Sequence, residues 1–200
     1  MDTKKRIIET ALKLFNSNGS YTVTTRHIAA EMNISPGNLY YHFGNKEEII
    51  RIILKGMIEE FNLFIRPAAY NADLAEQFND TISHMGKIMY NYRFFFMEIS
   101  TLLEKDPVLK KMYMKIKQER DADFKAIFQF LDKAGLVEQT LSDEEFTIIK
   151  ENAWTMAEFL LQSMYMNRIK ITPENIIKKF SHVMYMVRPY LKKEFREFIK

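Results

Sequence analysis

The chain has 200 residues, of which 47% are hydrophobic, and it contains no cysteine. This size and composition suffice for one or two domains with a buried core, and the lack of cysteine excludes disulfides and thiolate zinc sites. The net charge is only +3, and the first 50 residues carry six basic and five acidic side chains, which excludes a broad basic surface. No apolar run of about 18 residues is present and the charged N-terminus is unlike a signal peptide, so we expect a cytoplasmic protein without a membrane partner.

The N-terminal segment has the pattern of an amphipathic helix. Ile7, Ala11 and Phe15 recur every four residues and therefore share one face. Asn18 and Gly19 follow, and glycine adopts without strain the left-handed conformation in which helices commonly end. The sequence predicts a first helix that ends at these two residues.

The next segment predicts a short helix followed by a tight turn. Thr24 is a suitable N-cap, and Ile28, Ala29 and Met32 follow at spacings that form a single apolar face. Asn33 can adopt the left-handed conformation that ends a helix. A buried first helix of a two-helix motif is the expected result.

A second short helix starts with Ser35 as N-cap and Pro36 in its first turn, and it runs to about His42. Leu39 and Phe43, four residues apart, give it one inward face, so its other side chains, including three rings, are left exposed. Such an exposed helix needs a partner, and two short helices around a tight turn are typical of helix-turn-helix motifs that bind DNA. We therefore predict a helix-turn-helix over about residues 24–43.

These residues resemble the DNA-binding domain of the tetracycline-repressor (TetR) family of bacterial transcription regulators. The likeness rests on Thr24 to Ala29, Leu39 to Phe43 and Lys46, and it covers roughly residues 4–60. It implies a sequence-specific DNA-binding regulator, most commonly a repressor, that is all-helical and not an enzyme. The C-terminal parts of the family differ widely, so the resemblance does not identify the signal.

The resemblance also implies roles for individual residues. Arg26 matches an arginine that can reach a guanine edge, and Thr24 and Thr25 suit a phosphate at a helix N-terminus. Pro36 stands where some relatives carry a longer polar side chain, so DNA shape is expected to carry part of the specificity. The predicted DNA-contacting residues are Thr24, Thr25, Arg26, Ser35, Pro36, Gly37, Asn38, Tyr40, Tyr41, His42 and Lys46.

Start and stop signals of helices continue along the rest of the chain. Asn45 with Glu48 resembles a capping box, Asp73 and Asp106 are further N-cap candidates, and Pro67 and Gly135 are stop signals. No segment alternates with period two for long. The expected helices cover about residues 46–65, 73–92, 93–104, 107–134, 143–169 and 173–187, with a short helix after Pro189. The predicted fold is all-α, with a DNA-binding domain at residues 1–46, a linking helix at 46–65, and a helical domain for ligand binding and dimerisation at 66–200.

The last two long helices carry wide apolar faces. Two such helices from each of two chains could form a four-helix bundle across a twofold axis, which is the usual dimer interface of the family. The alternative is that these faces only cover the core of the same chain. The predicted interface residues are Phe146, Ala153, Leu160, Met164, Ile176, Phe180, Val183 and Met184.

The middle of the chain is rich in aromatic and methionine side chains. At helical spacing these are most often ordinary core, and the alternative is a cavity for a small, mostly apolar effector that releases a palindromic operator. The candidate lining residues are Met89, Phe95, Phe96, Tyr113, Phe124, Phe128 and Trp154.

Other functions were weighed against this interpretation. No catalytic residues, cofactor or metal site are expected, because the four histidines are scattered and no phosphate-binding glycine loop is present. His84 and His182 could meet in the fold, but lone helical histidines are usually surface or packing residues. Tyr40 and His42 could be half-buried packing residues and Arg26 a solvated charge. A helix-turn-helix protein controlled by a protein partner, without an effector, is the second functional hypothesis.

Overall fold

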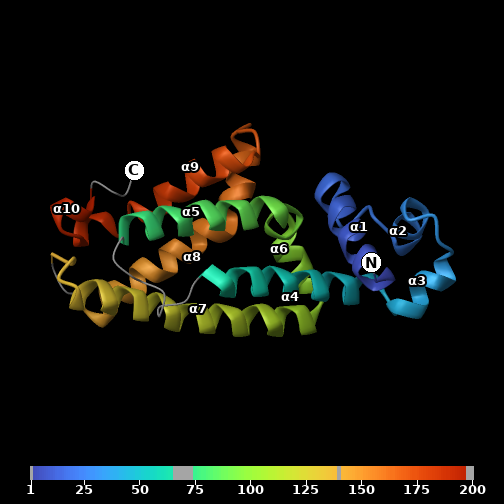
Figure 1. The fold of residues 1–200 in the computed structure, drawn as a ribbon, viewed down its shortest axis with the longest axis horizontal. Helices are drawn as coiled ribbons and strands as arrows, with labels where there is room; N and C mark the ends of the chain where they lie inside the picture. The colour runs from blue at the N-terminus through green and yellow to red at the C-terminus, as the bar shows by residue number, and fades with distance from the viewer. Residues whose placement is uncertain (1, 65–73, 139–140, 197–200) are drawn as a thin grey trace.

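The computed structural model describes residues 2–64, 74–138 and 141–196. The described residues form ten α-helices, one short 3-10 helix and no strand, which confirms the all-α prediction (Figure 1). None of these helices is long and apolar enough to cross a membrane. Their bounds are α1 Thr3–Asn18, α2 Thr25–Glu31, α3 Pro36–His42, α4 Lys46–Phe64, α5 Leu74–Asn91, α6 Arg93–Lys105, α7 Pro107–Lys133, α8 Asp143–Met166, α9 Pro173–Met184, the 3-10 helix η2 Arg188–Tyr190, and α10 Lys193–Arg196.

Most helix starts were predicted from their caps. The side chain of Asp106 caps α7 by accepting from Val108 N and Leu109 N at 3.0 Å. At the start of α4, Glu48 N donates to Asn45 Oδ1 at 2.8 Å, as expected. Pro67 and Asp73, taken as the stop of α4 and the cap of α5, lie outside the described residues.

Three helices end in a Schellman motif, in which one residue turns left-handed and the next N–H reaches five residues back. These residues are Asn33 after α2 (φ 54°), Gly135 after α7 (φ 71°) and Arg168 after α8 (φ 56°). The sequence predicted the first two. It predicted a helix to residue 169, which was wrong, because Arg168 adopts this conformation although it is not a glycine and ends α8 at residue 166.

The C-terminal segment is less regular than predicted. α9 ends at residue 184 rather than 187, and the chain turns through the 3-10 helix that contains Pro189. Leu191 then forms an isolated antiparallel bridge with Val137, and Lys192 N donates to Leu136 O at 2.8 Å. These contacts fix the C-terminal segment against the end of α7.

The helix-turn-helix is built on α1 and the first turns of α4 (Figure 1). Ile7, Ala11 and Phe15 from α1 pack against Leu39 and Phe43, and all five side chains are buried. This cluster continues beyond residue 46, the predicted domain boundary. It takes in buried residues at the end of α5 and in α6, namely Ile88, Tyr92, Phe94, Phe95 and Ile99. The DNA-binding end and the body therefore share one core.

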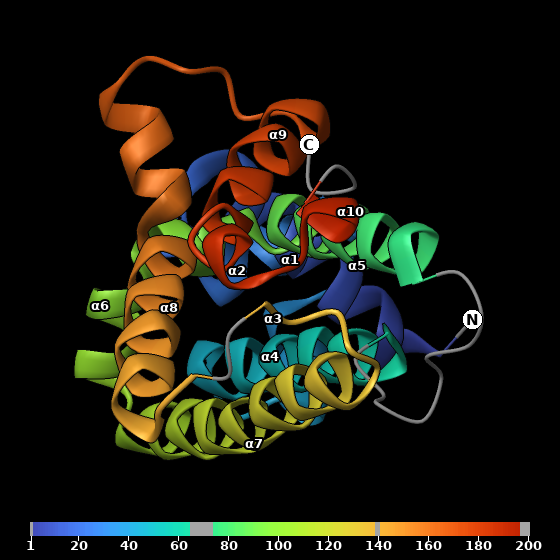
Figure 2. The same cartoon turned by 90° about the vertical axis from the view of Figure 1, so that its left-hand side faces the viewer.

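The body is a bundle whose helices surround a common interior. In the view from its far end, α4 and α7 lie on one side, α5 and α9 on the opposite side, and α8 along a third (Figure 2). A second core cluster joins α5, α8 and α9. Its buried residues are Ile82, Met89, Leu161, Met164, Ile176, Phe180 and Val183.

This second cluster corrects the predicted dimer interface. Met164, Ile176, Phe180 and Val183 are buried within this cluster of the same chain and so leave little surface for a partner. Amphipathic spacing shows which face of a helix is buried, but not which element covers it. Of the other predicted residues, Phe146 packs on rings of α7, Ala153 lines the interior, Leu160 packs half-buried against the second cluster, and the side chain of Met184 lies outside those described.

α5 and α9 approach each other most closely at Gly86. A Cβ placed on Gly86 would overlap Ile177 Cγ1 and lie 3.2 Å from Ile177 Cα and N. The backbone of α9 therefore occupies the space that a side chain would need. Gly56 on α4 differs, because its added Cβ would only meet the hydroxyl of Tyr92 at 3.7 Å.

We expect Gly86→Ala to destabilise the protein by about 1–3 kcal/mol, because overpacking outweighs the gain in helix propensity. The matched control is Gly56→Ala, which should be neutral or stabilising by up to about 1 kcal/mol. Urea unfolding followed by circular dichroism measures both. Equal effects of the two substitutions would contradict the close packing of α5 on α9.

Candidate nucleic-acid interface and internal cavity

The N-terminus of α2 is closed by a reciprocal cap. Thr24 Oγ1 accepts from His27 N, and Thr24 N donates to His27 Nδ1, both at 3.3 Å. The cap holds Thr25 and Arg26 at the first turn of α2, where Arg26 is exposed. This role of His27 was not predicted from the sequence, although its position three residues after the N-cap, where Glu or Gln usually stands, was the available signal.

α3 presents a largely uncharged surface to solvent. Ser35 Oγ caps it by accepting from Asn38 N at 3.1 Å. Pro36, Gly37 and Asn38 are exposed, and Tyr41 keeps 86% of its surface. The exposed face of α3 thus consists of its first turn, with Pro36 and Gly37, followed by the polar Asn38 and the aromatic Tyr40 and Tyr41.

Contacts between side chains join α2 and α3 across the turn. Thr25 Oγ1 and Tyr40 OH lie 3.0 Å apart, and Tyr40 is half exposed. The His42 ring is partly buried and packs edge-on against Tyr41. Of the eleven residues predicted to contact DNA, ten lie on α2, on α3 or at the N-caps of these two helices.

Lys46, the eleventh, is the first residue of α4 and holds the loop that leads into α2. Its ammonium group donates to Ser20 O at 2.6 Å and to Val23 O at 3.1 Å. It therefore fixes the start of α2 relative to α4.

The same loop is tied to the body. Ser20 N donates to Glu98 Oε1 of α6 at 2.9 Å, and Ser20 Oγ donates to Glu98 Oε2. Lys46, Ser20 and Glu98 thus form a chain of contacts from α4 through the loop to α6. A displacement of α6 must move the loop that starts α2.

Asn16 makes a second connection, from α1 to the N-terminus of α6. Its Nδ2 donates to Asn91 O at 2.6 Å, and its Oδ1 accepts from Phe94 N at 3.1 Å. Asn16 therefore supplies a cap that the N-cap residue of α6, Tyr92, does not provide. Beside it the rings of Phe15 and Phe94 pack with centroids 5.2 Å apart.

An ion pair makes the third connection, between α4 and the start of α7. Arg51 Nε donates to Asp106 Oδ2 at 2.7 Å and its NH2 to Oδ1 at 3.1 Å. Burial raises the pKa of Asp106, but the Arg51 guanidinium and the N–H of Leu109 outweigh this, so the pKa lies below its ordinary value of 3.8. The carboxylate is therefore more stable in the folded protein than in the unfolded chain.

The interior of the body contains a cavity of about 260 Å³. Its wall is formed by α4 to α9 and by residues near the C-terminus, including Met57, Phe61, Met85 and Ile116. Six of the seven residues proposed from the sequence lie in the wall, namely Met89, Phe96, Tyr113, Phe124, Phe128 and Trp154. Phe95 does not, because it points into the first core cluster, where it contacts Phe94 and Tyr113.

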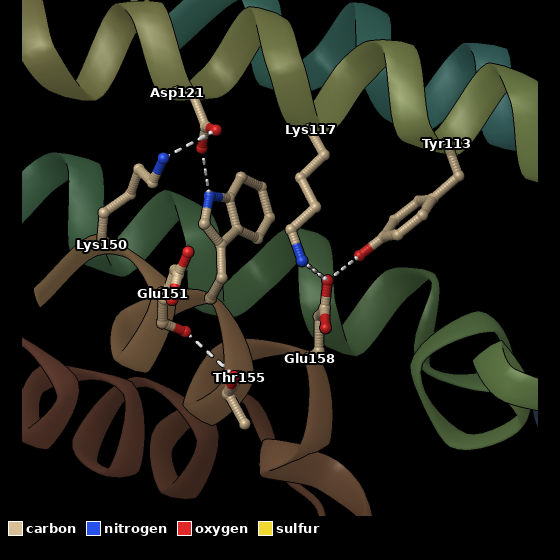
Figure 3. A network of polar contacts seen from close by, with 8 residues as sticks. Tyr113, Lys117, Asp121, Lys150, Glu151, Thr155 and Glu158 are labelled. Atoms are coloured by element: carbon tan, nitrogen blue, oxygen red, sulfur yellow. Dashed lines mark hydrogen bonds and ion pairs between the residues drawn. The ribbon is translucent and has the colours of Figure 1, made fainter. Parts of the chain in front are cut away.

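Polar contacts join α7 and α8 along one side of the cavity (Figure 3). Asp121 accepts from Lys150 Nζ at 3.1 Å and from the indole N–H of Trp154 at 2.9 Å. Glu158 accepts from Tyr113 OH at 2.6 Å and from Lys117 Nζ at 3.0 Å. Burial and this carboxylate raise the pKa of Tyr113, which therefore stays a donor. Each acidic group thus accepts from two donors within the protein.

The described residues contain no group of three or more His, Asp or Glu side chains that could hold a metal ion. His182, on α9, packs edge-on against Tyr185, the residue that follows this helix. Burial lowers the pKa of His84, helped by the charge of Lys87.

Two family models match the chain. The model described as bacterial regulatory proteins of the tetR family covers residues 7–52, and the TetR model described as a bacterial transcriptional repressor covers residues 57–198. Together they span both the helix-turn-helix and the body.

Individual relatives agree with this assignment. The biofilm operon icaADBC negative transcriptional regulator IcaR of Staphylococcus epidermidis is 30% identical over 141 residues, which are 70% of this chain and 66% of IcaR. The transcriptional regulator HbdR of Aromatoleum is 37% identical over 60 residues, 30% of this chain and 26% of HbdR. The chain thus spans less than two thirds of either relative.

Solved structures share the whole fold. A TetR-family regulator from Marinobacter aquaeolei matches with a TM-score of 0.89 and 28% identity, covering 100% of this chain and 96% of that one. SmeT, the repressor of a Stenotrophomonas maltophilia multidrug efflux pump, matches in fold with a TM-score of 0.71 and 12% identity, covering 98% and 93%.

The lowered pKa of Asp106 makes the contact between α4 and the start of α7 sensitive to acid. Because that pKa is lowered by folding, the ion pair stabilises the protein above about pH 3.8, and this contribution is lost as the pH falls below it. We expect Asp106→Asn to lower the free energy of unfolding at neutral pH by about 3 kcal/mol and the difference from wild type to shrink below pH 3.8. Urea unfolding across this pH range measures it. Glu104→Gln, at an exposed position of α6, should show neither effect, and a difference independent of pH would refute the role of the ion pair.

Proposed function

The chain belongs to the TetR family of bacterial transcriptional regulators, and from this we propose that it is a homodimeric repressor that a small hydrophobic effector releases from a palindromic operator. Regulators of this family bind DNA and are not enzymes. The observation that carries the proposal is the pairing of an exposed, rigidly capped α3 with an apolar cavity whose wall includes α4. These are the two sites that such regulation requires.

DNA recognition is proposed to rest on hydrogen-bond donors held in fixed positions and not on long-range electrostatic attraction. Arg26 offers the forked guanidinium that pairs with the O6 and N7 of guanine. Gly37 lets the backbone of α3 approach the bases, and Asn38 can pair with adenine or a phosphate. Tyr41 and His42, at the C-terminal end of α3, are proposed to contact phosphates and set the register.

A second copy of the chain is proposed to dock on α8. Its outer face carries Ile148, Met156, Phe159 and Met166, which keep 41–74% of their surface exposed. The positions between them on this face, Asn152, Thr155 and Ser163, are exposed and uncharged. An apolar face without charges is typical of the centre of an interface, and a twofold axis there would double the number of recognition helices. The dimer would present two α3 helices to successive major grooves about 34 Å apart.

Effector control is proposed to act through α4 and α6. Both helices contribute to the cavity wall, and both hold the loop that leads into α2, through Lys46 and Glu98. A ligand that prefers one spacing of these helices would shift the two α3 helices away from the spacing that DNA requires. The cavity favours this proposal over control by a protein partner alone.

The base-reading role of Arg26 is tested by selecting bound sequences from a random duplex pool. We expect Arg26→Ala to relax the base preference at one position of each half-site by about 1–3 kcal/mol, because one bidentate pair is lost. Lys13→Ala is the control, since Lys13 is exposed on α1 and lies beside Asn91 and Arg93 at the junction with the body. Selection of the same consensus by Arg26→Ala and wild type would count against this role, and failure of the wild type to bind any duplex at low salt would refute the proposed function.

The proposed dimer face is tested by placing a charge on it. We expect Phe159→Glu to give a folded monomer, because a carboxylate is tolerated at this exposed position but not within an apolar interface. Val108→Glu, at an equally exposed position on α7, should remain dimeric. Sedimentation at micromolar concentration gives the mass, and a dimer of Phe159→Glu as stable as that of the wild type would place the interface elsewhere.

A further inference from the structure

The cavity wall is apolar except for a few polar side chains, and most of these are already satisfied. Lys150 is paired with Asp121, and Glu158 accepts from both Tyr113 and Lys117 (Figure 3). Asn62 of α4 accepts from Arg120. The charged groups on the α7–α8 side therefore need no ligand.

Arg120 is the exception. Its NH2 group donates to Asn62 Oδ1 at 2.8 Å, and its NH1 lies 3.0 Å from Asp123 Oδ2, an ion pair one turn further along α7. Nevertheless, Nε and NH1 are buried atoms without a hydrogen-bond partner, and they are the only side-chain atoms of this kind among the described residues. The whole Arg120 side chain keeps only 14% of its surface exposed. A buried donor without an acceptor is unfavourable, so these nitrogens require an explanation.

We propose that Arg120 anchors the head group of the cavity's ligand, and that this ligand is an amphipathic carboxylate with a compact hydrocarbon body. The inference rests on the proposed function, because it takes the cavity as the effector site. A planar guanidinium binds the two oxygens of a carboxylate through parallel hydrogen bonds, and it does so most strongly where water is excluded. The surrounding methionine and aromatic side chains then receive the hydrocarbon body.

The charge balance of the wall favours an anion over a cation. A cationic head group would need a free carboxylate, but Glu158 and Asp121 are each engaged by two donors. Asp123, with 26% of its side chain exposed, can turn toward solvent when a ligand carboxylate takes its place beside Arg120. The cavity volume of about 260 Å³ lies near the lower end of ligand pockets, roughly 300–1,000 Å³, and so suits a small acid.

Arg120 also connects the ligand to the DNA-binding end. Its hydrogen bond to Asn62 links α7 to α4, the helix that begins at Lys46 under the helix-turn-helix. A carboxylate that reorients the guanidinium would alter this link directly. The head group, and not only the volume of the guest, would then influence α4.

The test compares octanoate with 1-octanol and octylamine, which share one hydrocarbon chain and differ in the head group. Calorimetric titration of the full chain at neutral pH should show octanoate binding at least about tenfold more tightly than either of the others. Arg120→Met keeps an unbranched apolar side chain and removes the donors. It should weaken octanoate binding about tenfold or more and leave 1-octanol within about twofold. Arg120→Lys keeps the charge but not the forked donor geometry, so its affinity for octanoate should lie between those of the wild type and Arg120→Met. It replaces the Met variant in this test if that variant does not fold.

Lys115→Met is the matched control, because Lys115 is an exposed cation on α7, pairs only with the exposed Glu119 among the ion pairs of the described residues, and is not part of the cavity wall. It should keep the preference for octanoate. Equal binding of the three compounds by wild type, or an unchanged preference in Arg120→Met, would overturn the assignment of Arg120.

Titration of the same compounds against the DNA complex separates this inference from the proposed function. If octanoate binds in an Arg120-dependent way but operator affinity stays constant, effector release fails and the carboxylate site stands. If 1-octanol releases DNA as well as octanoate does, effector release stands and the role of Arg120 is refuted.

Discussion

The junction at which α1 packs against α4 and α6 determines how a change in the body can reach the DNA-binding end. The N-terminus of α6 lies against α1, and Asn16 supplies the acceptor that the backbone there would otherwise lack. The packed, tilted rings of Phe15 and Phe94 exclude water beside this contact. Because these groups belong to the same core cluster as the helix-turn-helix, the body cannot rearrange near α6 without straining the DNA-binding end.

Recognition of DNA depends on the same rigidity. With nearly balanced charge in the first 50 residues, long-range attraction contributes little, so affinity must come from donors held in place before binding. The caps formed by Thr24 and Ser35 and the support from Lys46 provide this order. A dimer would add a second set of the same contacts, which is why the uncharged outer face of α8 matters for the proposed function.

The cavity and Arg120 reduce the stability of the body, since a void loses packing contacts and a buried guanidinium with two nitrogens that lack a hydrogen-bond partner loses solvation. The α7–α8 side tolerates buried charges because Asp121 and Glu158 are satisfied within the chain. Asp121 and Glu158 therefore maintain the structure. Arg120, with two nitrogens that lack a hydrogen-bond partner, is the group available to a ligand. A cavity lined by a partly unsatisfied guanidinium is consistent with selection for binding over maximal stability.

The sequence by itself determined the features that depend on near neighbours in the chain: the helix-turn-helix, the caps at Thr24, Ser35 and Asp106, and the stop at Gly135, because these are satisfied within a few residues. It could not predict that Arg168 adopts a left-handed backbone conformation, because an arginine, unlike a glycine or asparagine, does not indicate that conformation. Only the tertiary structure decided which element each apolar face covers. Phe95 and Phe96 are adjacent in the sequence, yet one packs under the DNA-binding end and the other lines the cavity. Likewise, Met164 and Phe180 are buried in the cluster that joins α5, α8 and α9, because helical periodicity gives the direction of burial while the packing of distant segments supplies the partner.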